Sequence, residues 1–143
     1  MPLGIEYAIL DIQSKVATLT GINLAPDYPP EGIAAFPTAI TWAKDGGTVL
    51  RSAGFASIQQ TIVLDIHFGR GILPATIENS LPYHDLMMKL IIADPDLSNT
   101  VQGIDDIRTY YGFLTYGVQA TKENPPGIGW RFEIDIHYDL TST

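Results

Sequence analysis

The sequence predicts a single α+β domain in which two helices cover one face of an antiparallel or mixed β-sheet. Three observations support this prediction. The chain of 143 residues is long enough for one self-sufficient core, so residues 1–143 are expected to form one domain. Apolar side chains recur at helical spacing in two segments and alternate with polar ones in several others. The order is helix, strands, helix, strands, which favours an α+β domain over a parallel doubly wound sheet.

The first element is a predicted helix over residues 5–19. Its apolar positions recur three or four residues apart and form one stripe. They are Ile5, Ala8, Ile9, Ile12, Val16 and Leu19. Gly21 is expected to end the helix. Residues 23–37 contain four prolines, which lack the backbone N–H that a regular ladder needs, so this segment is predicted to be an extended loop.

Two strands are predicted next. Residues 38–43 are rich in β-branched and aromatic side chains, and the following Lys44-Asp45-Gly46-Gly47 is expected to form a tight turn because its glycines permit positive φ angles. Residues 48–56 fit either an irregular strand or a mobile loop, and both interpretations stay open. Residues 58–68 alternate between apolar and polar side chains, which predicts a long strand with one buried face.

A second helix is predicted to begin at Ser80, which can act as its N-cap with Pro82 in the first turn. Its apolar stripe consists of Tyr83, Leu86, Met87, Leu90 and Ile91. The helix is expected to stop at Asp94-Pro95-Asp96.

The C-terminal third is predicted to hold two or three strands. Residues 104–108 and 110–120 are rich in tyrosine and β-branched side chains, and residues 121–129 contain a predicted loop with two prolines. Residues 130–140 alternate almost without exception. One side of that strand carries Trp130, Phe132, Ile134, Ile136, Tyr138 and Leu140. The other side carries Arg131, Glu133, Asp135, His137 and Asp139.

The composition of the chain excludes several classes of function. A net charge of -8 and an isoelectric point near 4.5 disfavour a surface that wraps nucleic-acid phosphates. Because the chain has no cysteine, it has no disulfide, thiolate zinc site or cysteine nucleophile. Its apolar runs are shorter than the roughly 20 residues of a membrane span, and its start lacks the features of a signal peptide. We therefore expect synthesis in a cytoplasm and no membrane partner.

One repeated pattern could carry metal chemistry. Asp65-Ile66-His67 is echoed by Asp135-Ile136-His137, and each places a carboxylate and an imidazole on the polar side of a strand. If the two strands were neighbours, these groups and Glu133 could converge on zinc or another transition metal, whose open position would activate water. The alternative is a polar face turned to water, which the alternation requires in any case. We favour this alternative and predict no metal site.

The sequence lacks other catalytic signatures. We interpret His84, which precedes Asp85, as part of a solvated helix face. The chain has no G-x-S-x-G motif for a serine nucleophile. Gly69-Arg70-Gly71 lacks the further glycines and the Lys-Ser/Thr pair of a phosphate loop. We therefore predict no catalytic residue and no cofactor, and expect that the protein is not an enzyme.

Some apolar residues lie in segments that do not obviously belong to a core. Three of them lie in the uncertain stretch 48–56: Val49, Leu50 and Phe55. Three others lie in proline-rich loops: Ile33, Phe36 and Ile128. These side chains either fold onto their own domain or stay exposed and form a subunit interface, and both interpretations stay open. We take Val49, Leu50 and Phe55 as the candidate interface residues.

Several segments carry a further signal when they are taken together. In chain order they are the opening helix, the proline-rich segment up to Ala35-Phe36-Pro37, the Trp42 strand, the strand Ile58–Phe68, the helix Leu81–Ile92, Asn99-Thr100-Val101, Tyr110–Gly117 and Gly129–Ile134. This succession resembles the tail terminator, or tail completion, proteins of long-tailed bacteriophages. The resemblance covers most of the chain.

The resemblance implies a hexameric ring at the head-proximal end of the phage tail tube. The ring would stop tube growth and offer a docking surface, so the implied partners are further copies of the chain, the major tail tube protein and the head-completion or neck protein. It implies no catalysis, metal or cofactor. DNA would pass through the lumen without sequence-specific contact, and acidic charge there would repel its phosphates. The implied location is the virion tail, with assembly in the host cytoplasm.

Other functions remain open. Head–tail connector or neck proteins of the same phages have a similar size and layout, and tail tube proteins share the arrangement of sheet and helices. A tube protein is expected to have a long hairpin for stacking, which the Lys44–Ser57 region could form. A different class is a small metal- or ligand-binding cytoplasmic domain. It would use Asp65, His67, Asp135 and His137.

Overall fold

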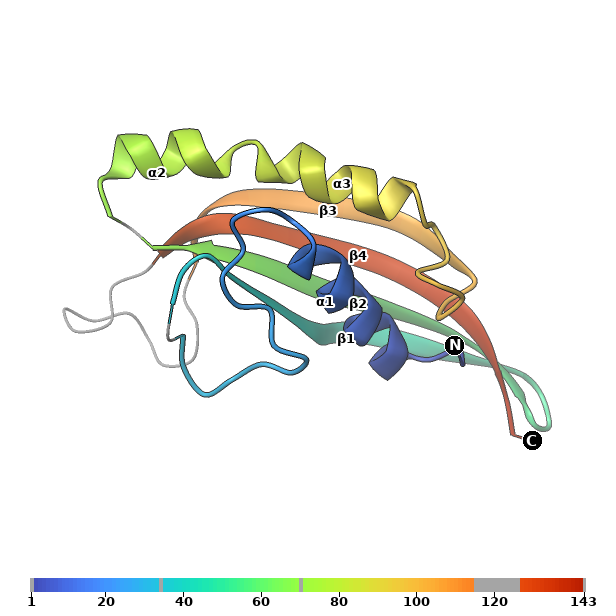
Figure 1. Cartoon of the computed structure of the whole chain (residues 1–143). Helices are drawn as coiled ribbons and strands as arrows, with labels where there is room; N and C mark the ends of the chain where they lie inside the picture. The colour runs from blue at the N-terminus through green and yellow to red at the C-terminus, as the bar shows by residue number, and fades with distance from the viewer. Residues whose placement is uncertain (1, 34, 70, 115–126, 143) are drawn as a thin grey trace.

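A four-stranded antiparallel sheet carries all the helices on one face in the computed structural model, which describes residues 2–33, 35–69, 71–114 and 127–142 (Figure 1). The strand order in the sheet is β1-β2-β4-β3. The strands are β1 (Thr38–Ser52), β2 (Phe55–Phe68), β3 (Gly103–Leu114) and β4 (Gly127–Thr141). The helices are α1 (Ile5–Ala17), α2 (Leu73–Ser80) and α3 (Tyr83–Ile92). The predicted α+β class is confirmed.

Helix α1 packs its predicted apolar stripe onto the sheet. Ala8, Ile12 and Val16 are completely buried there. The helix ends at Ala17, two residues earlier than predicted, and the chain then turns at Gly21. Gly21 has a φ of +96°, and a Cβ at this position would collide with the Tyr83 hydroxyl group. A glycine is therefore required by both the backbone angle and the close approach.

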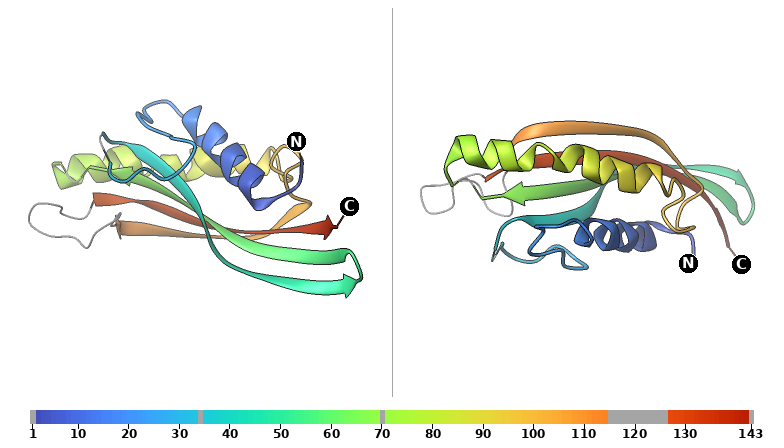
Figure 2. Two further views of the ribbon diagram at one scale, coloured as in Figure 1. Left: turned by 90° about the horizontal axis from the view of Figure 1, so that it is seen from below. Right: turned by 45° about the horizontal axis from the view of Figure 1, so that its top comes forward.

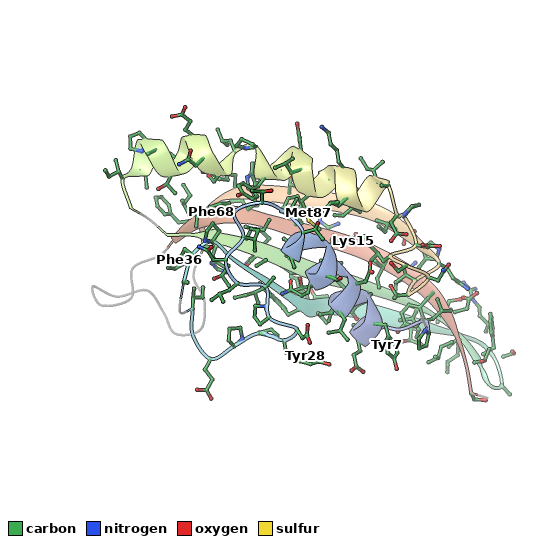
Figure 3. The ribbon with its side chains drawn as sticks, viewed as in Figure 1. Tyr7, Lys15, Tyr28, Phe36, Phe68 and Met87 are labelled. Atoms are coloured by element: carbon green, nitrogen blue, oxygen red, sulfur yellow. The ribbon has the colours of Figure 1, made fainter. Side chains whose placement is uncertain are left out.

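The core lies between the helices and one face of the sheet. Even-numbered residues of β2 and β4 point into it, because side chains alternate along a strand and the two strands are in antiparallel register. The buried side chains of these two strands on this face are Ile62, Leu64, Ile66, Phe68, Ile128, Phe132, Ile134, Ile136 and Tyr138. Figure 3 shows Phe68 and Met87 in the layer between α3 and the sheet. The predicted alternation is confirmed, except that Leu140 is 50% exposed.

The predicted turn at residues 44–47 is wrong. Strand β1 continues through it, with a bulge between Ala43 and Gly46, and the true turn lies at Ala53 and Gly54. A Cβ at Gly46 would collide with the Gln60 side chain and with the backbone oxygen of Gln59. The glycine at the bulge therefore serves the close approach of two strands. Of the two interpretations of residues 48–56, the structure shows the strand.

The second predicted helix is a bent pair, α2 and α3. Helix α3 buries Met87 and Ile91 of the predicted stripe but leaves Leu86 42% exposed, and α2 was not predicted. Ser80 is the last residue of α2 and not an N-cap, so that prediction is wrong. Its hydroxyl group hydrogen-bonds the Tyr111 hydroxyl at 2.6 Å and the Ile77 carbonyl at 3.2 Å. Pro82 has no backbone N–H, which interrupts the helical ladder and produces the bend.

Strand β3 pairs along its described length with β4 as far as His137, and β4 continues beyond that point beside β2. Strand β3 is continuous over Gly103–Leu114, where the sequence had suggested two separate strands. Strand β4 begins three residues before the predicted start at Trp130. The predicted strand residues 115–120 and loop residues 121–126 lie outside the described part of the chain.

Candidate interface surfaces

The outer part of the β1–β2 hairpin, residues 44–60, projects beyond the helices, and we refer to it as the hairpin arm (Figure 2). Residues 43–54 are all exposed. Strand β4 accompanies β2 along the arm as far as the pair between Phe55 and Thr141, so the arm is a three-stranded extension of the sheet.

The candidate interface residues all lie on the hairpin arm. Val49 is 51% exposed and Leu50 is 81% exposed, whereas Phe55 is half-buried beside the turn. Leu50 pairs with Ala56 and therefore points to the helix side of the sheet, while Val49 points to the opposite side. The structure thus leaves Val49 and Leu50 accessible on both faces of the arm.

The apolar residues in the proline-rich loops behave differently from one another. Phe36 is 42% exposed, Ile33 is half-buried and Ile128 is buried at the start of β4. Ile128 therefore belongs to the core and offers nothing to a partner.

The face of the sheet that lies opposite the helices, here termed the second face, has a buried end. Asp65 on β2 is completely buried there, and Arg131 on β4 donates to both its oxygens at 2.9 Å. Such a two-point contact is the strongest geometry for this ion pair. The hydrogen bond to Asp65 raises the pKa of Arg131. Arg131 also lies 5.4 Å from the centre of the Trp42 ring, on which its cation can stack.

The middle of the second face carries a row of alternating charges. Glu133 accepts from Lys44 at 3.0 Å and from Arg108 at 3.4 Å, and Arg108 donates to Asp135 at 2.6 Å. The bond from Lys44 lowers the pKa of Glu133, and the bond from Arg108 lowers that of Asp135. Asp135 also accepts from Thr61 at 2.6 Å. The basic side chains of this row are thus held by carboxylates.

The four residues of the possible metal site do not converge. Their strands are indeed neighbours, but Asp65 lies opposite Arg131, whereas Asp135 lies opposite Thr61. The two aspartates are therefore four residues apart along the sheet, which corresponds to about 13 Å, and the two histidines, opposite Gly129 and Gln59, are farther apart still. Among the described residues, no group of three or more histidine and carboxylate side chains could hold a metal ion.

The two histidines of these motifs have different surroundings. His67 is buried, and burial lowers its pKa, which favours the neutral imidazole. His137 is partly exposed, and its Nδ1 lies 2.8 Å from Asp105 in the bulge of β3. The polar face predicted at these positions is therefore buried at His67 and partly exposed to solvent at His137.

His84 is more than a member of a solvated helix face. Its ring stacks on Phe132 with a centroid distance of 5.8 Å, and it contacts Trp130 at 4.9 Å. Its Nδ1 lies 2.8 Å from a carboxylate oxygen of Asp85. The side chain thus covers the aromatic edge of the core while one nitrogen stays at the surface.

The partners of the charged residues on the second face were not among the predicted site residues. Arg131, Lys44 and Arg108 were not singled out, although they neutralise the acidic residues of that face. The strand register decides these pairs, and it could have been inferred only once β2 and β4 were known to be adjacent.

No family model matches this chain, and no curated protein matches it in sequence. In the described parts of the chain, none of the helices combines the length and the apolar character needed to cross a membrane. The fold and the exposed surfaces of the chain are therefore the basis for a proposed function.

Proposed function

We propose that this protein is a tail terminator of a long-tailed bacteriophage. In this proposal, copies of the chain form a ring, with six subunits, at the head-proximal end of the tail tube. The ring ends tube polymerisation and presents the surface to which the head-completion protein docks. The protein resides in the virion after assembly in the host cytoplasm. The proposal assigns it no catalytic residue and no cofactor.

The observation that carries the proposal is the hairpin arm. Val49 and Leu50 are exposed to solvent there, on the part of β1 that extends beyond the helix-covered part of the sheet. Burying an exposed side chain of this size contributes about 1.5–3 kcal/mol, so a partner that covers the arm gains a substantial free energy of association. A long projecting hairpin with exposed apolar side chains suits a subunit that must contact other subunits.

The charges of the second face fit a surface that lines a DNA channel. Lys44, Arg108 and Arg131 are each engaged by carboxylates, and the chain as a whole carries a charge of -8. Free basic side chains would hold DNA through its phosphates, whereas paired ones offer it little attraction. DNA would therefore slide past this face without being read in sequence.

The test of the proposed function is a phage from which this protein has been removed. We expect filled heads that are separate from overlong or uncapped tails, and joining restored when the purified protein is added to those tails. Tails of normal length together with heads that leak DNA would identify a neck protein and overturn the proposal.

A second candidate, a tail tube protein, is favoured by the length of the hairpin. Strands β1 and β2 form the long hairpin that stacking of tube subunits requires. Removal of a tube protein would leave no tube at all. The same phage experiment therefore distinguishes the two candidates.

A further inference from the structure

The outer edge of β1 is protected at its start and open at its end. At the start, the Ala39 N–H donates to the Leu24 carbonyl at 2.9 Å, and Leu24 bridges Thr38. The bulge before Gly46 then interrupts the edge. Beyond it, residues 46–52 are all exposed, contain no proline and carry one charge, that of Arg51. Natural proteins usually block such an edge with charges, prolines or a covering segment.

Strand β3 forms the other edge of the sheet. In the part of the chain that the structure describes, no strand pairs with its outer side. Its residues 107–111 have high β-propensity, Thr109 is exposed, and Tyr110 is 55% exposed. Two acidic residues, Asp105 and Asp106, lie at its start. The open edge of β1 therefore carries one basic residue, and the start of the β3 edge carries two acidic residues, of which Asp106 lies 3.4 Å from Arg108 of the same strand.

The two edges run in opposite directions. Each of the three strand pairs is antiparallel, so in the order β1-β2-β4-β3 the first and last strands are antiparallel to each other. A second copy that is related by rotation can therefore place its β1 beside β3 and continue the antiparallel sheet. Repetition of such a head-to-tail contact closes into a ring when the rotation allows it.

We propose that residues 46–52 of β1 pair with the β3 edge of a second copy, with Arg51 opposite Asp106. This pairing rests on the proposed ring. It brings Leu50 beside Ile107 and Thr48 beside Thr109. The pairing satisfies charge complementarity at one end and covers Leu50, which is 81% exposed in the single chain.

The faces of the two strands agree in this register. Leu50 and Thr48 pair with Ala56 and Ile58 of β2, so both point to the helix side. Ile107 and Thr109 also point to that side, because they pair with Ile134 and Phe132 of β4. Arg51 donates to Ser57 at 3.2 Å on the second face, which is also the face of Asp106. A shift by one residue would oppose side chains from different faces.

Disulfide trapping tests this interface, because the natural chain has no cysteine. Thr48→Cys and Thr109→Cys proteins are purified separately, mixed and oxidised. Residues opposite each other on antiparallel strands have Cα atoms about 4.5–5.5 Å apart, within the range of a disulfide. We expect a covalent dimer from the mixture and none from either protein alone. The double variant should give a ladder of multimers up to the full ring.

A matched control replaces Thr109→Cys by Ser14→Cys, which is exposed on α1 and lies on neither edge strand. This mixture should give no dimer. A dimer formed by Thr48→Cys alone would indicate β1-to-β1 pairing and would overturn the proposal.

The mass of the unmodified protein, measured alone and on purified tubes, distinguishes a failure of this interface from a failure of the proposed function. A ring without the Thr48–Thr109 crosslink would overturn this interface and leave the proposed function standing. A chain that stays monomeric in both conditions would overturn both.

A charge exchange gives a second test in the ring-forming protein. Arg51→Asp and Asp106→Arg should each abolish assembly, and the chain carrying both should recover it.

Discussion

The helix-covered part of the sheet and the hairpin arm are built from the same two strands, yet they differ in what covers their side chains. In β2, residues 62–68 are all buried, whereas none of residues 55–61 is. In β1, burial ends at Thr41. The strand pairing nevertheless continues to the turn. The strands of the arm are therefore held by backbone hydrogen bonds and by pairing with the third strand, β4, and not by burial of their side chains. These side chains remain available for contacts with other molecules.

The largest effect on stability is expected from truncation in the core. Phe132→Ala removes a fully buried ring and should lower the free energy of unfolding by about 3–5 kcal/mol, which urea titration measures. The matched truncation in the arm, Leu50→Ala, should change it by less than about 0.5 kcal/mol. Equal losses for both variants would contradict the distinction between the two regions.

The next largest effect concerns the buried end of the second face. Asp65→Asn weakens the two-point contact with Arg131 and should cost about 1.5–3 kcal/mol, because hydrogen bonds to charged groups contribute that much. Asp135→Asn serves as the control, since its pair with Arg108 is largely exposed and contributes less than about 1 kcal/mol. If thermal unfolding of the two variants is the same, the buried pair has no special role.

A smaller, pH-dependent effect is expected where α1 meets the loop after α3. Lys15 donates to Asp94 at 2.6 Å and holds the pKa of Asp94 at about 2. A carboxyl group with a lowered pKa stabilises the fold above its unfolded value near 3.8, and this contribution disappears as the pH falls towards 2.

Because Asp94 is partly exposed, we expect about 1 kcal/mol from this pair. Urea midpoints of the natural chain should fall between pH 5 and pH 2 more than those of Asp94→Asn. Parallel curves for the two proteins would show that the pair does not stabilise the fold.

The smallest effect on folding, and the largest on assembly, is expected from Leu50→Asp. The residue is 81% exposed, so the free energy of unfolding should change by less than about 0.5 kcal/mol. An unpaired charge in a buried contact is costly, so the assembled mass measured by light scattering should drop to that of a single chain. Ile72→Asp, at a 78% exposed site before α2, should leave assembly intact. If the Leu50→Asp protein still assembled, the arm would not be part of the interface.

The sequence predicted those elements in which one periodicity decides the structure. The alternation of Trp130 to Tyr138 gave the correct face of β4, and the stripe through Ile12 gave α1. The turn predicted at Gly46 was wrong because, in a sequence, a glycine required by the close approach of two strands cannot be distinguished from a glycine required by a turn.

The candidate surfaces were predictable only in part. Val49 and Leu50 could be singled out as apolar residues in an unusual context. The separation of Asp65 from Asp135 could not, because it depends on the register between β2 and β4, which a single sequence does not encode locally. The edge pairing of Arg51 and Asp106 depends likewise on the strand order.

The end of β4 lies against the turn of the arm. The Ser142 N–H donates to the Gly54 carbonyl at 2.9 Å, and Thr141 lies opposite Phe55. Because of this contact, a label at Ser142 would lie beside the turn of the arm, and the outer residues of the arm itself would stay unchanged. Since the chain has no cysteine, a fluorophore or spin label on a single Ser142→Cys would sense changes in polarity and motion at the turn. Such a label would make the kinetics of the proposed subunit docking accessible to spectroscopy in real time.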